Sequence, residues 1–187
     1  MATVYISLGS NVGSRLANCL TALERMEGFG IKVEKGSPWF LSEPLGIPQP
    51  WFINAVARTY TLMSPHTLLH RLQEIERKMG RKTKGTGGPR IIDLDIILYD
   101  RIVLTTPWLT LPHPRFRERR FVLEPLVTLA PRLKDPLTGL TAQELLEKCQ
   151  DPSRVIPLKT GGKDLEIGGL DRPAHPERLP RAFWRRL

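Results

Sequence analysis

The sequence predicts an α+β domain with a ferredoxin-like βαββαβ core, in which helices pack on an antiparallel sheet. Two observations support this fold class. Short apolar or alternating segments, typical of strands, are interleaved with segments of helical periodicity in that order. Turn residues separate the segments, and the chain contains no internal repeat. Its 187 residues are enough for one domain with a hydrophobic core.

The first half of the predicted core contains three strands and one helix. Residues 3–9 form an apolar run that ends in turn residues, and they predict the first strand. Leucine and methionine recur at helical spacing between residues 13 and 28, which indicates a helix. Alternation favours strands over residues 31–39 and 52–62. The stretch between them, residues 42–51, holds three prolines and is therefore expected to be a loop.

The second half begins with a clear helix signal. Ser64 is a favoured N-cap residue, Pro65 suits the first helical position, and Gly80 is a typical stop. Residues 90–99 then predict a strand. The remaining expected elements are a short helix over residues 122–131, a helix over residues 141–149 with Thr141 as its N-cap, and a last strand over residues 154–158.

The composition is that of an ordinary soluble globular protein, with 41% hydrophobic and 25% charged residues. No leader or membrane-spanning run is apparent, so a cytoplasmic location is expected. Cys19 and Cys149 lie too far apart for a zinc spacing or a disulfide framework, and both are expected to be small buried hydrophobes. Residues 1–158 are predicted to be the functional domain. Residues 159–187 form a basic extension rich in Gly, Pro and Arg, either disordered or packed as an extended arm.

The chain is strongly basic, because 28 Lys and Arg residues outnumber 19 Asp and Glu residues and give a net charge of +9. Such a charge is consistent with a polyanionic partner, which could be a nucleic acid or a small phosphate compound. It is equally consistent with a surface that is merely basic and soluble. The positions of the basic residues along the chain therefore have to distinguish a polyanion-binding site from a merely basic surface.

Two aspartates, Asp93 and Asp95, interrupt an otherwise apolar strand in the stretch "GPRIIDLDIILYD". Because alternate strand residues share a face, both carboxylates are expected on one side of the sheet. Their mutual repulsion requires a positive partner, either Mg²⁺, which favours one or two carboxylates plus phosphates, or an arginine such as Arg90. The alternating apolar residues are expected to face the core on the other side: Ile92, Leu94, Ile96 and Leu98.

Basic residues flank the aspartates in both directions. Residues 77–90 hold six Lys and Arg residues and no acid, and residues 82–88 form a glycine-rich loop that can approach a ligand closely. A second basic segment, residues 113–120, could complete a phosphate-binding cage or be a solvated loop. An acidic pair beside a basic loop suits a metal-bound triphosphate. Neither a P-loop nor a protein-kinase motif set is present.

Five segments together resemble the 6-hydroxymethyl-7,8-dihydropterin pyrophosphokinase family of folate biosynthesis. They are "ISLGSN", "EPLGIPQPWFINAV", "IERKMGR", "GPRIIDLDIILYD" and "LPHPRFRERRFVLEPL", and the resemblance extends from Met1 to about Leu158. It implies transfer of pyrophosphate from ATP to the hydroxymethyl group of the pterin, release of AMP, and Mg²⁺ as the cofactor. The implied partners are ATP and the pterin. No nucleic acid or membrane partner is expected, and the protein is expected to be a monomer or a weak homo-oligomer.

The resemblance also implies a role for individual residues. Asp93 and Asp95 match the metal ligands. The positions that match pterin-binding residues are Leu45, Gly46, Phe52, Asn54 and Phe121. Those that match ATP-binding residues are Glu76, Arg81, Arg90, His113 and Arg119. Without the resemblance, core packing would explain Phe52 and Phe121, and an exposed amide would explain Asn54.

The sequence departs from the family pattern in the basic loop and at the C-terminus. Gly87 stands where the family often has tryptophan, and a second loop arginine is missing. We expect Lys84 to take the part of that arginine, so the predicted catalytic set is Arg81, Lys84, Arg90, Asp93 and Asp95. Two other functions are compatible with the scaffold: an RNA-binding module, although its aromatic strand motif is missing, and a structural scaffold for other folate enzymes, which needs no aspartate pair.

Overall fold

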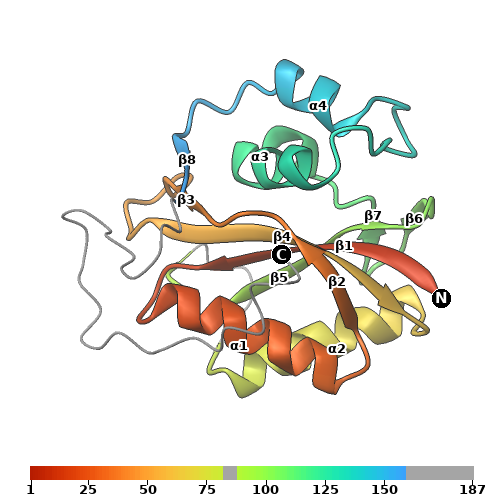
Figure 1. The fold of residues 1–187 in the computed structure, drawn as a ribbon, viewed down its shortest axis with the longest axis horizontal. Coiled ribbons are helices and arrows are strands. Elements are labelled where there is room, and N and C mark those ends of the chain that lie inside the picture. The colour runs from red at the N-terminus through yellow and green to blue at the C-terminus, as the bar shows by residue number, and fades with distance from the viewer. Residues whose placement is uncertain (82–87, 159–187) are drawn as a thin grey trace.

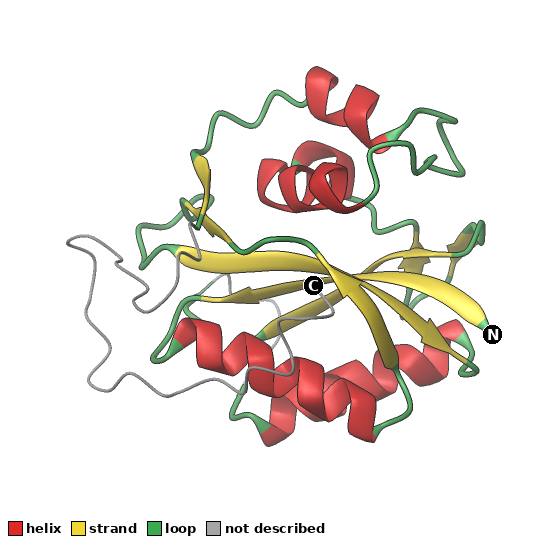
Figure 2. Cartoon of the chain, in the orientation of Figure 1, coloured by secondary structure: helices red, strands yellow, loops and turns green. Residues whose placement is uncertain are grey.

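The computed structural model describes residues 1–81 and 88–158, and it shows a six-stranded sheet with helices on both faces (Figures 1 and 2). The predicted combination of an antiparallel sheet with helices packed on it is confirmed. Most of the basic loop, with Lys84 and Gly87, and the whole extension 159–187 lie outside the described residues, so the expectations placed on them stay predictions.

The sheet is antiparallel in every pairing. Its strand order is β5-β1-β4-β3-β8, and β2 also pairs with β4. The strands are β1 (Ala2–Ser10), β2 (Lys32–Gly36), β3 (Phe40–Ser42), β4 (Phe52–Thr61), β5 (Asp93–Tyr99) and β8 (Val155–Pro157). A small separate hairpin pairs β6 (Leu104–Thr105) with β7 (Thr110–Leu111).

The helices divide between the two faces of this sheet. Figure 1 shows α1 (Arg15–Gly28) and α2 (Pro65–Lys78) below it, and α3 (Arg120–Leu129) and α4 (Ala142–Lys148) above it. A short 3₁₀ helix, η1 (Phe116–Glu118), leads into α3. The predicted caps are confirmed: the Ser64 hydroxyl accepts from the backbone N–H of Thr67, and Thr141 forms a reciprocal capping box with Glu144.

Each face of the sheet has its own hydrophobic core. The first core lies against α1 and α2 and includes Leu8, Ala55 and Leu94, while the second lies against α3 and α4 and includes Val56. Because both faces are covered, consecutive residues of the central strands are buried, as the 3% exposure of Ala55 and the 0% exposure of Val56 illustrate. The central strands therefore form a rigid base for side chains at their ends.

The expected single strand over residues 31–39 is wrong, because two strands occupy this region. β2 ends at Gly36 and β3 begins at Phe40, and both pair with β4. Between them, the Ser37 hydroxyl accepts from the backbone N–H of Val56 at 3.0 Å and thereby replaces a backbone acceptor. The next residue, Pro38, has no N–H to donate to a ladder. The strand is interrupted for these two reasons.

The expected orientation of Leu98 is also wrong. Ile92, Leu94 and Ile96 lie in the first core as predicted, but Leu98 lies in the second core. The register explains the change, because β1 pairs Ile6 with Ile96 and then Tyr5 with Leu98, so that Ile97 is an extra residue on β5. Such a bulge reverses the alternation beyond it. The aspartates precede the bulge, so their predicted common face is unaffected.

The remaining elements agree with the sequence in type. α3 begins two residues before the expected segment, at Arg120, and β8 forms within the predicted last strand. Cys19 is buried as expected and burial raises its pKa to about 12, whereas Cys149 is only partly buried. Among the described residues, none of the helices has both the length and the apolar character that crossing a membrane would require.

Candidate active site

One row of residues across the sheet brings the predicted pterin and metal residues together. Gly9 of β1 pairs with Asn54 of β4 on one side and with Asp93 of β5 on the other. Because directly paired residues of antiparallel strands share a face, Asn54 and Asp93 project from the same side. Two strand spacings put their backbones about 10 Å apart. Gly9 is buried and has no side chain, so no Cβ stands between them.

Asn54 is held in one orientation by its neighbours. It is 2% exposed, and its Nδ2 donates to the Ser42 hydroxyl of β3 at 2.6 Å. Its Oδ1 lies against Gly9, where an added Cβ would come within 2.8 Å of it. The alternative of an exposed surface amide is therefore wrong. Neither Ser42 nor Gly9 was predicted from the sequence, although Gly9 lies within the "ISLGSN" segment.

Each of the two predicted pterin-stacking aromatics lies near a predicted ATP-binding arginine. Phe52 lies at the start of β4, and the Arg90 guanidinium is 5.9 Å from its ring centre. Phe121 lies in the first turn of α3, and the Arg119 guanidinium is 5.6 Å from its ring centre. Both rings are only partly buried. These contacts join the aromatic and cationic parts of the site.

The loop between β3 and β4 borders a cavity of about 470 Å³. The predicted pterin residues Leu45 and Gly46 line it, and Gly46 has a positive φ of 84°. The loop is anchored by Asn11, whose Nδ2 donates to the Gln49 Oε1 at 3.0 Å and to the Pro50 carbonyl at 3.1 Å. Asn11 is a further residue that was not predicted from the sequence, despite its place at the end of "ISLGSN".

The cationic part of the site contains arginines that are already paired. The Arg81 side chain, 9% exposed, forms ion pairs with both Glu76 of α2 and Asp93 of β5. Arg90 Nη1 donates to the second Asp93 oxygen at 2.6 Å. Glu76 is 2% exposed and also accepts from the backbone N–H of Leu94 at 2.8 Å. The alternative that arginines pair with the aspartates is thus realised at Asp93, and Glu76 connects α2 to β5.

The surrounding charges keep Asp93 ionised. Burial alone would raise its pKa, but Arg81 and Arg90 outweigh burial and hold the pKa below its usual value. The same arginines screen this carboxylate from its neighbour Asp95. The predicted repulsion between the two aspartates is therefore relieved by the chain itself.

Asp95 faces the second basic segment. Its Oδ2 lies 3.9 Å from both His113 Nε2 and Arg119 Nη1, and its side chain is 33% exposed. Burial and, to a lesser degree, the positive charges of Arg119 and Arg115 together lower the pKa of His113 to about 4. His113 is thus neutral near pH 7. The structure brings His113 and Arg119 to the same carboxylate, as the cage interpretation requires.

The two aspartates fit a magnesium ion in number and in chemistry. Within residues 1–81 and 88–158, no group of three or more His, Cys, Asp or Glu residues gathers that could hold a metal by itself. Mg²⁺ does not need such a group, because it often binds one or two carboxylates together with water and substrate phosphates. Asp95 is accessible, and each Asp93 oxygen keeps a second lone pair beside its arginine bond.

Comparisons with known proteins agree on one family. The sequence model of 7,8-dihydro-6-hydroxymethylpterin-pyrophosphokinase matches residues 5–131. The chain is 40% identical to the 2-amino-4-hydroxy-6-hydroxymethyldihydropteridine pyrophosphokinase of Synechocystis over 169 residues, covering 90% of this chain and 85% of the relative. It is also 46% identical over 167 residues, 88% of this chain, to the folic acid synthesis protein fol1 of Pneumocystis carinii.

Some relatives are much longer than this chain. The match covers 23% of the Pneumocystis protein and 21% of the fol1 protein of Schizosaccharomyces pombe. Among solved structures, the HPPK-DHPS of Plasmodium falciparum aligns with a TM-score of 0.65 at 16% identity, over 79% of this chain and 44% of that one. This structural likeness supports the fold alone.

Proposed function

Since the chain belongs to the 7,8-dihydro-6-hydroxymethylpterin-pyrophosphokinase family, we propose that it transfers pyrophosphate from ATP to 6-hydroxymethyl-7,8-dihydropterin. The hydroxymethyl oxygen attacks the β-phosphorus, the bond from that phosphorus to the α-phosphate oxygen breaks, and AMP leaves. The row formed by Asn54, Gly9 and Asp93 supports this proposal, because an amide suited to the edge of a heterocycle and a carboxylate suited to a metal-bound phosphate share one face.

The pterin is proposed to bind over Gly9, between Phe52 and Phe121. A flat heterocycle with donors and acceptors at its edge suits two aromatic faces and one amide. Asn54 would pair with that edge, and the backbone at Leu45 and Gly46 would contact the same ring. Since the Ser42 hydrogen bond and the contact with Gly9 already fix the amide, little orientational freedom is lost when the pterin binds.

The triphosphate is proposed to bind between the two basic segments. Arg81, Arg90 and Arg119 would neutralise charge on the transferring oxygens, and neutral His113 can donate a hydrogen bond to one of them. Asp93 and Asp95 would hold Mg²⁺, which supplies charge neutralisation between neighbouring phosphates. No side chain has to act as a covalent nucleophile. Catalysis then depends on positioning and on charge.

Two finer proposals accompany this function. Lys84 is proposed to act in place of the missing loop arginine, as a point charge rather than a bidentate fork. The ferredoxin-like assignment is supported by the element order: when β2 and β3 count as one interrupted strand, the core follows βαββαβ with antiparallel pairing throughout.

The proposed activity is tested by incubating the protein with ATP, Mg²⁺ and the pterin and measuring AMP. We expect AMP and the pterin diphosphate in equal amounts, and neither product when the pterin or the metal is omitted. Release of ADP or phosphate without AMP would contradict pyrophosphate transfer. Binding of RNA without Mg²⁺-dependent binding of a non-hydrolysable ATP analogue would favour the RNA-binding module instead.

A further inference from the structure

We infer that the C-terminal segment (residues 149–157) positions the pterin-binding part of the site, and that Asp151 is its principal positioning residue. The inference rests on the proposed function and extends it to a part of the chain beyond residues 5–131, which the family model matches. The segment makes three separate attachments, each to an element that carries residues of the candidate site.

The first attachment is at the start of α3. Asp151 Oδ2 accepts from the backbone N–H of Arg120 at 2.9 Å, although the two residues are far apart in sequence. The residue at the N-cap position, Arg119, contributes no side-chain cap. Asp151 therefore supplies the acceptor that the first turn of this helix otherwise lacks, and its charge is favourable at a helix N-terminus.

This cap lies between two candidate site residues. Arg120 separates Arg119, which reaches Asp95, from Phe121, which is proposed to stack on the pterin. Asp151 is itself fixed, because it is 9% exposed and its Oδ1 accepts from the backbone N–H of Ser153 at 2.9 Å. The direction of both side chains thus depends on a turn that is held from outside the helix.

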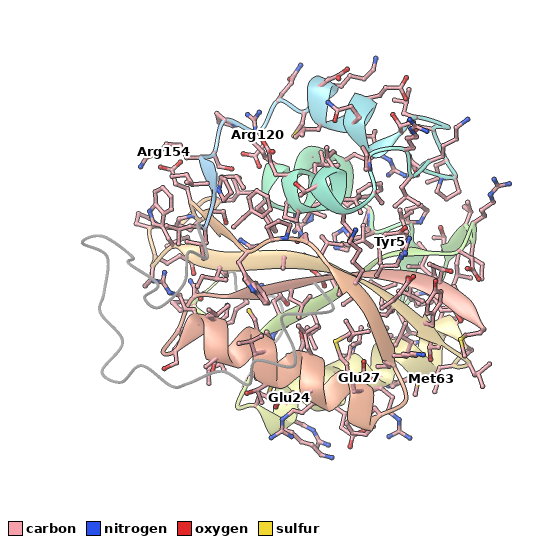
Figure 3. The ribbon with its side chains drawn as sticks, viewed as in Figure 1. Tyr5, Glu24, Glu27, Met63, Arg120 and Arg154 are labelled. Atoms are coloured by element: carbon pink, nitrogen blue, oxygen red, sulfur yellow. The ribbon has the colours of Figure 1, made fainter. Side chains whose placement is uncertain are left out.

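The second attachment is to the loop between β3 and β4. The backbone N–H of Arg154 donates to Glu43 Oε2 and its Nε donates to Glu43 Oε1, both at 2.9 Å, while the Glu43 N–H donates to the Arg154 carbonyl at 3.0 Å. The guanidinium also lies 4.9 Å from the ring centre of Trp51. Both ends of the loop that carries Leu45 and Gly46 therefore contact Arg154, which Figure 3 labels together with Arg120.

The third attachment is to the sheet. β8 pairs with β3 in a register that opposes Val155 to Ser42, the residue that holds the Asn54 amide. Pro152 and Ser153 also line the cavity that Leu45 and Gly46 border. One short segment thus contacts α3, the pterin loop and β3. Each of the three carries a proposed pterin-binding residue or, in the case of β3, the Ser42 hydroxyl that holds Asn54.

A local effect on binding is expected when Asp151 is changed, rather than general unfolding. The later part of α3 is anchored independently, because Val122, Leu123 and Leu126 are buried in the second core. Only the first turn, with Arg119 and Phe121, loses the hydrogen bond that Asp151 accepts from the Arg120 N–H. ATP binding should be less affected, because only one of the three proposed phosphate-binding arginines, Arg119, lies in this turn, whereas Arg81 and Arg90 belong to elements that Asp151 does not contact.

The test compares Asp151→Ala and Asp151→Asn with Thr141→Ala, a control that removes the cap of α4. In Asp151→Ala we expect the KM for the pterin to rise about tenfold, as for loss of a charge-assisted hydrogen bond, and the KM for ATP to change by less than about twofold. Asparagine can still accept from the Arg120 N–H, so Asp151→Asn should restore much of the pterin binding. Thr141→Ala should lower the thermal midpoint without changing either KM.

The possible failures are distinguishable. If the wild type forms no AMP, the proposed function fails and this inference fails with it. If the wild type is active and Asp151→Ala binds the pterin normally, the positioning role is wrong while the activity stands. An equal rise in both KM values, or the same rise in Thr141→Ala, would reduce Asp151 to a contributor to stability. If Asp151→Ala does not fold, Glu43→Ala tests the segment at its second attachment. A raised pterin KM with an unchanged ATP KM in that variant supports the positioning role, and an unchanged pterin KM overturns it.

Discussion

The two halves of the candidate site differ in how their polar groups are satisfied before any ligand binds. On the pterin side, Asn54 is neutral, buried and bonded to Ser42, and Gly9 beside it leaves room for its amide oxygen. On the nucleotide side, Arg81, Arg90 and Asp93 are charged and bonded to one another. The Asn54 amide is thus already oriented as a proposed ligand would need it. The charged groups of the nucleotide half are instead paired with one another.

This difference has an energetic consequence. A heterocycle can enter the pterin half without breaking an existing hydrogen bond of Asn54 Oδ1 to the described residues, so preorganisation favours binding. A triphosphate can recruit Arg81 only by competing with Glu76 and Asp93. We expect that exchange to be favourable only when Mg²⁺ replaces the positive charge that Asp93 loses as Arg81 and Arg90 bind the phosphates. Metal and nucleotide should therefore bind the nucleotide half together rather than separately.

The largest effect is expected from the two aspartates. Asp93→Ala and Asp95→Ala should each lower kcat by at least about 10²-fold, the range found when an essential charge-stabilising group is removed. Their stabilities should differ. Asp93→Ala leaves Arg81, only 9% exposed, with one carboxylate partner fewer, and should lower the free energy of unfolding. Asp95 is more exposed, so Asp95→Ala should have little effect on it. Urea denaturation and AMP release measure the two quantities.

Near-normal turnover in either aspartate variant at ordinary Mg²⁺ concentrations would contradict the metal assignment. Equal stability of the two variants would contradict the description of the nucleotide half as a cluster held by its own ion pairs. Asp95→Asn is a useful control, because it keeps the volume and removes only the charge.

Gly9→Ala should affect the pterin half through one atom. Its Cβ would come within 2.8 Å of Asn54 Oδ1, so the amide has to move. We expect the KM for the pterin to rise by about tenfold or more, since a moderate packing conflict costs about 1–3 kcal/mol. Gly139→Ala, in a turn with φ 73° outside the candidate site, provides a strained-glycine control. Unchanged pterin binding in Gly9→Ala would contradict the proposed dependence of pterin binding on the position of the Asn54 amide.

Asn54→Ala should weaken pterin binding selectively. The lost hydrogen bonds correspond to about 1–3 kcal/mol, or roughly tenfold in the dissociation constant, while the affinity for ATP should be unchanged. Ser42→Ala should produce a smaller loss in the same direction, because it releases the amide without removing it. Calorimetry with each ligand separately measures both. An equal loss for ATP and pterin would mean that Asn54 does not belong to one half alone.

The smallest effect on activity is expected from Asp135→Asn, which tests a charge cluster outside both halves. The Asp135 carboxylate accepts hydrogen bonds from Nε and Nη2 of Arg117, each at 2.7 Å. Burial would raise its pKa, but Arg117 and Thr138 hold the pKa below its usual value. Its contribution to stability is therefore present above about pH 4 and is lost as pH falls further. The difference in unfolding free energy between wild type and variant should be constant near pH 7 and shrink below about pH 4, with kinetics little changed.

Local sequence signals predicted the helices better than the strands. They also predicted individual site residues better than the long-range contacts that hold those residues. The caps at Ser64 and Thr141 act within one turn, so the sequence contains the whole interaction. The interruption at Ser37 and the bulge at Ile97 depend on the partner strand, which local alternation does not describe. The aspartates were predictable as a charged pair on an apolar strand.

Long-range pairing explains the parts of the site that were missed. Ser42, Asn11 and Asp151 are small polar residues whose types are common in loops, and only the fold shows what each one holds. Glu76 was predicted from the resemblance as an ATP-binding residue. Its burial between α2 and β5, and its ion pair with Arg81, favour a role in holding that arginine.

The position of β8 has a consequence for the behaviour of the protein in concentrated solution. β8 is the last strand on its side of the described sheet, and it covers β3, which would otherwise present unpaired backbone groups. Exposed edges of this kind promote aggregation by pairing with other chains. β8 is only three residues long and includes Pro157, which cannot donate to a further strand. The strand that completes this side of the sheet is thus itself a poor template for another molecule.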